Sequence, residues 1–266
     1  MTNEILVLGG TGKTGRRIVH RLQSAGHPVR VGSRRAPVPF DWSDRSTWTP
    51  ALRDVRTAYL SYYPDLAVPG APATIEAFTE HAVSCGATRL VLLSGRGEDE
   101  AETCERIVQD SGAEWTILRS SWFHQNFSED HLLEAVLAGE VALPVGAVPE
   151  PFVDAGDIAG VAVTALTGSG HVGQVYELTG PRLLTFADAV AEIAAASGRH
   201  IKFVEVPAQD YADALPPEIA PLLIYLFTTV LDGRNAHLTG DVRRVLGREP
   251  RDFTDYAKAT AATGVW

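Results

Sequence analysis

Three glycines lie between an apolar run and a helical pattern, and their spacing is the clearest chemical signal in the chain. Residues 5–15 read ILVLGGTGKTG, with Gly9, Gly12 and Gly15 three residues apart and Gly10 adding a second G-x-G-x-x-G register. Glycine lets the chain turn tightly and approach a ligand, and free N–H groups at the start of the next helix attract a pyrophosphate. The pattern predicts that a dinucleotide binds at this turn.

Two other interpretations of the same turn were weighed. The sequence Gly12-Lys13-Thr14 resembles the end of a nucleoside-triphosphate P-loop, but Val7 stands where that loop needs its first glycine. The simpler alternative is an ordinary tight strand-to-helix turn. We favour dinucleotide binding because the strand, the helix and the spacing all occur together.

The residues after the second predicted strand indicate which dinucleotide binds. NAD-specific proteins carry an acidic residue there, whereas this chain has Ser33 followed by Arg34 and Arg35. A hydroxyl and two guanidinium groups suit a 2′-phosphate, so NADP(H) is expected rather than NAD(H). The alternative is that both arginines are solvated surface residues. The next polar segment contains Asp41 and Trp42 and is expected over the adenine, where Asp41 either accepts a bond from the amino group or caps a helix.

The elements that must position these residues alternate between strand and helix. Strands are expected at residues 5–8, 29–32, 56–63, 89–94 and 115–119, each followed by a helical or polar segment. This order predicts an α/β fold of the Rossmann type, with a doubly wound parallel sheet. We therefore assign residues 1–128 to an NAD(P)-binding core.

The pattern changes after residue 128. We expect helices at 132–137, at 157–166 with Asp157 as N-cap, and at 185–196 with Thr185 as cap, together with strands at 175–178 and 202–206. Residues 141–151 are rich in turns, and 217–266 are mainly helical, with an apolar helix over 219–231 as a plausible lid. Residues 129–266 are assigned to a smaller α+β lobe that covers the substrate and is interleaved with the core sheet.

Several side chains at predicted strand ends could donate a proton. His124 is the leading candidate because its ordinary pKa lies near neutrality, with a satisfied structural histidine as an equal alternative. Tyr62 and Tyr63 could donate a proton or stack on a nicotinamide, and Ser94 could bond a substrate oxygen or only end its strand. Glu98 beside Arg96 could be a site pair, but solvated surface charges are the favoured interpretation.

Composition excludes several classes of function. The net charge is −10 over 266 residues, so no broad basic surface is available for nucleic acid or an anionic membrane. The longest apolar run is too short to span a bilayer. Two cysteines are too few for a disulfide framework, no metal-ligand spacing occurs, and the first strand begins too early for a signal peptide. The expectation is a cytoplasmic protein without metal, membrane or nucleic acid, and either a monomer or a homodimer.

A larger set of motifs resembles a known family. The segments GGTGKTG, VGSRR, RLVLLSGRGE, WTILRSSWFHQNF, EPFVDAGDIAGVA and VYELTGPRLLTFADAV are similar to the NmrA-like atypical short-chain dehydrogenases/reductases, and nearest to the festuclavine and agroclavine dehydrogenase branch. The resemblance covers roughly residues 5 to 258. It implies a Rossmann fold with a small C-terminal lobe, a cleft between the lobes and NADP(H) or NAD(H) as cofactor.

The resemblance also implies roles for individual residues. The pyrophosphate would be held by Gly9, Thr11, Gly12, Lys13, Thr14 and Gly15, and the adenosine ribose would lie at Ser33 and Arg34. The far half of the cofactor would be lined by Ser61, Tyr62, Ser94 and Gly95. The nicotinamide or substrate would face Trp122, Phe123 and Asn126. For Trp122 and Phe123 the alternative is plain core packing.

The chain departs from typical short-chain reductases in one respect. The Tyr-x-x-x-Lys pair that donates a proton in those enzymes has no counterpart after Ser94, and the chain has only three lysines, Lys13, Lys202 and Lys258. We therefore expect an NADPH-dependent reductase that transfers hydride to a small planar apolar substrate such as an iminium ion, a quinone or an enone. The alternative is a non-catalytic NAD(P)-sensing regulator, as known in the wider family.

Overall fold

The computed structural model describes residues 4–266, which form two compact units. One unit contains the chain up to Ser120 together with Ala155–Glu177, and the other contains Ser121–Asp154 and Leu178–Trp266. The chain first passes from one unit to the other after Ser120, whereas we expected the boundary at residue 128 from the sequence. The difference concerns residues 121–128, where Phe127 packs into the apolar cluster of the second unit.

A six-stranded sheet forms the centre of the first unit, in the order β2-β1-β3-β4-β5-β7. The neighbouring pairs from β2 through β5 are parallel, which confirms the predicted Rossmann-type fold class. The strands are β1 (Glu4–Leu8), β2 (Val29–Gly32), β3 (Val55–Leu60), β4 (Arg89–Gly95), β5 (Glu114–Ser120) and β7 (Gln174–Leu178).

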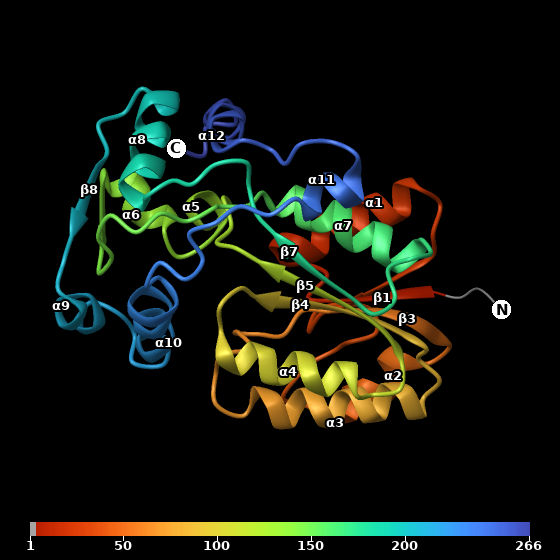
Figure 1. Cartoon of the computed structure of the whole chain (residues 1–266). Helices are drawn as coiled ribbons and strands as arrows, with labels where there is room; N and C mark the ends of the chain where they lie inside the picture. Colours follow the sequence, from red (N-terminus) through yellow and green to blue (C-terminus); the bar gives the residue numbers. More distant parts are fainter. Residues whose placement is uncertain (1–3) are drawn as a thin grey trace. The chain divides into compact units, whose positions relative to one another are not determined.

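Helices cover both faces of this sheet (Figure 1). On one face α1 (Lys13–Ser24) packs against α7 (Ala155–Thr167), and on the other α3 (Ala71–Ser84) packs against α4 (Asp99–Gln109). The short elements η1 (Arg45–Thr47) and α2 (Trp48–Leu52) lie between β2 and β3. Because both faces are covered, the central strands are apolar throughout and Leu6, Leu8 and Leu60 are completely buried.

The parallel arrangement brings the residues that follow each strand to one edge of the sheet. The chain leaves β1 at Gly9, β2 at Ser33 and β3 at Ser61, and β4 itself ends at Gly95. In open parallel sheets ligands bind at this carboxyl edge, beside the point where the strand order reverses. Here that point lies between β1 and β3, because β2 pairs with the opposite side of β1.

The second unit has a two-stranded parallel sheet and several helices. Its strands are β6 (Glu140–Leu143) and β8 (Lys202–Glu205). Its helical segments are α5 (Asn126–Glu129), α6 (Leu133–Ala138), α8 (Phe186–Ser197), α9 (Ala208–Asp213), α10 (Ala220–Tyr225), the π-helical η2 (Leu226–Val230), α11 (Asp241–Leu246) and α12 (Phe253–Ala261). Its core is aromatic, with Phe127, Phe152, Phe186, Phe253 and Tyr256 packed together.

Local predictions in the later part of the chain had mixed outcomes. The cap at Thr185 is confirmed, because its hydroxyl accepts the N–H of Asp188 in a capping box. Asp157 is not an N-cap, since α7 already begins at Ala155. The turn-rich segment 141–151 contains most of β6. The expected helix over 219–231 is divided into α10 and η2, where the hydrogen bonding widens to the π pattern.

Candidate functional site

The glycine turn joins β1 to α1. Gly9 has a positive φ of 66°, which a residue with a side chain adopts only at a cost, and its carbonyl accepts the N–H of Gly12 at 2.8 Å. Gly12 is the N-cap of α1, and no side chain of the described residues caps this helix. The first turn of α1 also lacks an acidic residue. The N-terminus of α1 is therefore suited to an anion.

Gly15 shows why the third glycine is needed. A Cβ atom at this position would lie 2.1 Å from the carbonyl oxygen of Gly9 and 2.8 Å from the Cα atom of Gly10. The absence of a side chain lets the helix approach the loop backbone this closely. The neighbouring Thr14 is buried, and its hydroxyl accepts a hydrogen bond from Tyr59 at 3.0 Å. The bond from Tyr59 fixes the Thr14 hydroxyl as an acceptor, so its own O–H hydrogen and the Thr14 N–H group are both left to donate to an anion.

Ser33 and its two following arginines lie after β2. The Ser33 hydroxyl oxygen is buried and has no hydrogen-bond partner among the described residues. Arg34 and Arg35 are exposed, and the Arg34 guanidinium lies 5.9 Å from the ring centroid of Tyr63. An unsatisfied hydroxyl next to two mobile cations fits a ribose phosphate, because each group could bond a phosphate oxygen.

Asp41 and Trp42 lie in the loop that leads to η1. The Asp41 carboxylate accepts the N–H and the hydroxyl of Ser43, which lower its pKa. The Trp42 indole N–H donates to the carbonyl of Ser61 at 3.1 Å, and its ring contacts Tyr62 at 5.1 Å. Trp42 thereby ties this loop to the end of β3. The Asp41 carboxylate caps its own turn, so an adenine amino group would compete with Ser43 for it.

The end of β3 lies directly against the glycine turn. A Cβ on Gly9 would be 3.2 Å from the Cβ of Ser61, so these two residues touch across adjacent strands. Tyr62 is half-buried against Trp42, whereas Tyr63 is 71% exposed. Most of the residues that the sequence assigns to the cofactor thus share the carboxyl edge of β1, β2 and β3.

Ser94 is part of a buried ion-pair network at the end of β4. Its hydroxyl donates to Glu105 at 2.6 Å, and Glu105 also accepts three bonds from the Arg119 guanidinium, two at 2.9 Å and one at 2.6 Å. The hydrogen bonds that Arg119 donates to the Glu105 carboxylate raise the pKa of Arg119. The proton of Ser94 therefore already has an acceptor within the protein. A role as proton donor would require this bond to break.

Arg96 and Glu98 are not the solvated surface pair that we expected. Both side chains are buried, and Arg96 bonds Glu177 of β7 at 3.0 Å rather than Glu98. Glu98 instead shares a hydrogen bond with Asp65, which follows β3. Sequence analysis missed Asp65. Its position could have indicated a role, because Asp65 lies five residues after the end of β3, in the same loop as the predicted site residues Ser61, Tyr62 and Tyr63.

His124 lies in the core of the second unit. The imidazole is fully buried, its Nε2 is 3.0 Å from the carbonyl oxygen of Phe152, and its Nδ1 is 3.7 Å from the Asp154 carboxylate. Its ring packs against Phe253 and Tyr256 at 4.9 Å and 5.1 Å. This environment matches the structural alternative for His124, and its role as an acid stays a prediction.

The predicted substrate residues also lie in the second unit. Trp122 is half-buried and packs against Phe227 of η2 at 4.8 Å and Phe186 at 5.3 Å. Phe123 is half-buried and forms an isolated bridge with Val153, and Asn126 is buried at the start of α5. Trp122 thus packs against the buried aromatic core of the second unit, which matches core packing, and its role toward a substrate stays a prediction.

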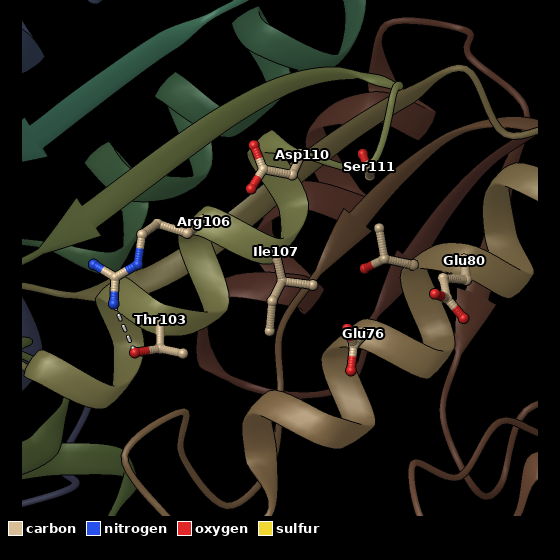
Figure 2. A pocket seen from close by; sticks show the side chains of 8 residues that line it. Glu76, Glu80, Thr103, Arg106, Ile107, Asp110 and Ser111 are labelled. Carbon is tan, nitrogen blue, oxygen red and sulfur yellow. Dashed lines mark hydrogen bonds between the residues drawn. The ribbon is translucent and has the colours of Figure 1, made fainter.

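A surface pocket between α3 and α4 is unrelated to these residues (Figure 2). It is lined by Glu76, Thr79, Glu80, Thr103, Arg106, Ile107, Asp110 and Ser111. The Arg106 guanidinium in it donates to the Thr103 hydroxyl at 2.9 Å. The lining residues come from two helices on one face of the sheet and not from the strand ends, so this pocket does not serve the glycine turn.

Membrane spans and metal centres are two further features that a chain of this kind could carry. Among residues 4–266, no helix is both long enough and apolar enough to cross a membrane. Over the same range, no group of three or more His, Cys, Asp or Glu side chains is arranged to hold a metal ion.

The chain is similar along its whole length to curated oxidoreductases. No family model matches it. It is 34% identical to the uncharacterized oxidoreductase YesF of Bacillus subtilis, covering 99% of this chain and 98% of that one. It is 32% identical to the NAD(P)H azoreductase of Xenophilus azovorans, with 97% and 98% covered. It is also 32% identical to the festuclavine dehydrogenase easG of Aspergillus fumigatus, with the same coverage.

Solved structures with the same fold include both enzymes and a regulator. An NADPH-dependent quinone oxidoreductase from Escherichia coli, complexed with NADPH, has a TM-score of 0.79 at 20% identity and covers 96% of this chain and 99% of its own. NmrA, a negative transcriptional regulator, has a TM-score of 0.74 at 16% identity and covers 99% and 98%. At these identities the likeness establishes the fold alone.

Proposed function

Because the chain belongs to the NmrA-like atypical short-chain dehydrogenase/reductase family, we propose that it is an NADPH-dependent reductase of small, planar, apolar substrates. The substrate class comprises iminium ions, quinones and enones. The curated relatives at this level of identity are named an oxidoreductase, an azoreductase and a dehydrogenase, which supports hydride transfer as the type of reaction.

The observation that carries the proposal is the close approach of α1, at Gly15, to the backbone of Gly9 and Gly10. A loop that packs its helix against bare backbone, with the first turn of α1 free of acidic residues, is suited to a diphosphate. In this proposal the pyrophosphate lies at Gly9, Thr11, Gly12, Lys13, Thr14 and Gly15. The preference for NADP(H) over NAD(H) rests on the unsatisfied Ser33 hydroxyl and on Arg34 and Arg35.

The remaining site residues are assigned by their positions. The adenosine is proposed to lie at Asp41 and Trp42, and the far half of the cofactor at Ser61, Tyr62, Tyr63, Ser94 and Gly95. The substrate is proposed to contact Trp122, Phe123 and Asn126, whose aromatic members provide flat apolar surface. The reduced nicotinamide supplies the hydride, and these residues bind and orient the partner that receives it.

The proton requirement separates the possible substrates. Helix α4 follows Ser94 and contains neither tyrosine nor lysine, so the usual proton-donating pair has no equivalent there. An iminium ion needs no proton, because hydride transfer neutralises its charge. A quinone or an enone needs a proton, and the sequence offers His124, Tyr62 and Ser94 as donors. His124 and Ser94 already bond Phe152 and Glu105.

The test measures binding and turnover on the same sample. Calorimetry with NADPH and NADH should give tighter binding of NADPH, and absorbance at 340 nm should fall when an iminium salt, a quinone or an enone is added. Binding without turnover on the whole panel would contradict the reductase. Absence of binding for both cofactors would remove the dinucleotide site as well.

A second function is favoured by one observation. The chain shares its fold over almost its full length with NmrA, a negative transcriptional regulator, and it lacks the usual proton-donating pair. A regulator would bind oxidised and reduced dinucleotide with different affinities and would not consume NADPH. The comparison of NADP and NADPH affinities in the same calorimeter, together with the turnover panel, separates the two functions.

A further inference from the structure

Three charged side chains from three separate loops meet at the carboxyl edge of the sheet. Lys13 begins α1 directly after the glycine turn, Asp65 follows β3, and Glu98 lies between β4 and α4. The carboxyl groups of Asp65 and Glu98 share a hydrogen bond, and the positive charge of Lys13 lowers the pKa of Asp65. Asp65 is fixed further by the N–H of Ala67, which donates to its Oδ1 at 2.9 Å.

The Glu98 carboxyl lies directly over the end of β4. A Cβ atom on Gly95 would be 1.9 Å from Glu98 Oε1, so only a glycine at this position leaves room for the carboxyl group. Glu98 is 8% exposed, and no N–H group of the described residues donates to its buried Oε2. Asp65 is only partly buried and is the member of the pair that solvent reaches.

Two adjoining carboxyl groups with little solvent cannot both be ionised at low cost. Burial raises the pKa of Glu98 well above its usual range, and the charges of Asp65, Glu100 and Glu105 raise it further. Burial also raises the pKa of Asp65, against the opposing effect of Lys13. The pair therefore titrates as a unit, and its last proton leaves at a higher pH than that of an ordinary carboxyl group.

We propose that Asp65 and Glu98 are the proton source of the reductase, with Asp65 as the acid and Glu98 as the positioning residue that keeps the proton in place. This inference rests on the proposed function and names the group that its proton-requiring substrates need. The supporting geometry is the location of the pair after β3 and β4, beside the glycine turn, where ligands bind in this fold. An orphaned buried oxygen on Glu98 is consistent with a proton that lies between the two carboxyl groups.

The step balances for an enone or a quinone. The substrate carbon that accepts the hydride gains a C–H bond, and the electron pair it displaces moves to the substrate oxygen. The O–H bond of the Asp65–Glu98 pair then breaks and an O–H bond forms on the substrate. The pair is left with two negative charges beside Lys13, and a proton from water restores it before the next turnover. An iminium ion needs only the hydride and bypasses the pair.

The experiment compares Glu98→Gln with Asp99→Asn. Glutamine keeps the size of the side chain but cannot share a proton with Asp65, whereas Asp99 is an exposed carboxylate at the adjoining position of α4. With menadione or cyclohexenone at pH 7.5, Glu98→Gln should lower kcat about a hundredfold, the usual contribution of a general acid. The NADPH affinity and the rate with a cyclic iminium salt should stay within about twofold, and Asp99→Asn should resemble the wild type.

The pH profile provides a reading that a purely structural role would not give. Wild-type turnover of the enone should fall as the pH rises through the pKa of the pair, whereas iminium turnover should not follow that titration. Glu98→Gln should move the fall to lower pH, because Asp65 alone is a stronger acid. Unchanged enone turnover in the variant, or an equal loss with enone and iminium, would overturn the proposal.

Two outcomes keep the inference separate from the proposed function. If the wild type reduces no acceptor, the proposed function has failed and this proton source fails with it; if only the variants behave unexpectedly, the inference alone has failed. Wild type that reduces the iminium but no enone or quinone would also refute it. Should Glu98→Gln not fold, infrared titration of the wild type decides: a protonated carboxyl band that titrates at lower pH in Asp65→Asn is expected, because the charge of Asp65 no longer opposes ionisation of Glu98, and its absence from the wild type overturns the proposal.

Discussion

Replacement of Gly15 by alanine tests the geometry on which the proposed function depends. The added methyl group would lie 2.1 Å from the carbonyl oxygen of Gly9, whereas non-bonded carbon and oxygen atoms approach to roughly 3.3 Å. The glycine turn or α1 must therefore move by about 1 Å, and backbone shifts of this kind cost about 1–3 kcal/mol of stability. The N–H groups aimed at the pyrophosphate move with it.

The effect on binding follows from the bonds that are lost. Each hydrogen bond to a charged group contributes about 1.5–3 kcal/mol, so loss of one or two such bonds weakens NADPH by about 3 kcal/mol. This corresponds to a dissociation constant roughly a hundredfold higher. Calorimetric titration with NADPH and thermal unfolding without it give both quantities.

A matched control lies at the other end of the same helix. Gly26 has a φ of 80°, but no atom of the described residues comes within 4 Å of a Cβ placed there. Gly26→Ala should therefore cost about 1 kcal/mol of stability through backbone strain and leave the NADPH affinity unchanged. Wild-type affinity in Gly15→Ala, or equal losses of affinity in the two variants, would refute the reasoning.

Three further predictions concern the cofactor, the core and the pH dependence of stability. Arg34→Ala should weaken NADPH by about 2 kcal/mol, roughly thirtyfold, and leave NADH nearly unchanged, because only the 2′-phosphate loses its partner; equal losses in calorimetry would remove that assignment. Glu105→Gln should lower the free energy of unfolding by about 3 kcal/mol in urea titration, since Arg119 then loses its hydrogen-bonded carboxylate and keeps only Glu102 and Glu177, at 3.6 Å and 3.9 Å, and a loss below about 1 kcal/mol would contradict this. The Arg182 guanidinium lowers the pKa of Asp252 to about 2, so this pair adds stability above the ordinary carboxyl pKa and loses it as the pH falls toward 2; thermal unfolding from pH 5 to pH 2 should therefore be less pH-dependent in Asp252→Asn, and an unchanged slope would exclude the pair as a cause.

Local patterns in the sequence were sufficient for the sheet and for the glycine turn. The apolar runs at 5–8 and 89–94 are buried strands, because a strand covered on both faces needs no polar positions. The cap at Thr185 follows from its own side chain and that of Asp188. Such features depend on neighbours within a few residues, so they can be read from the order of residues alone.

Features that depend on distant partners could not be read in this way. Arg96 and Glu98 are adjacent in a polar segment, yet each is buried by a partner from another part of the chain, Glu177 for Arg96 and Asp65 for Glu98. The division of the 219–231 segment into α10 and η2 likewise left no mark in its apolar pattern. Contacts across strands are set by register and crossover, which a one-dimensional pattern does not contain.

The sequence by itself thus determined the dinucleotide fold, the glycine turn and the arginines that follow β2, because each depends on local spacing or residue type. Only the tertiary structure decided which polar groups are already bonded within the protein, as Ser94 is to Glu105, and which are brought together, as Asp65 is with Glu98. The physical reason is that parallel strands bring residues more than thirty positions apart to one edge, where burial and a shared proton change the chemistry of ordinary side chains.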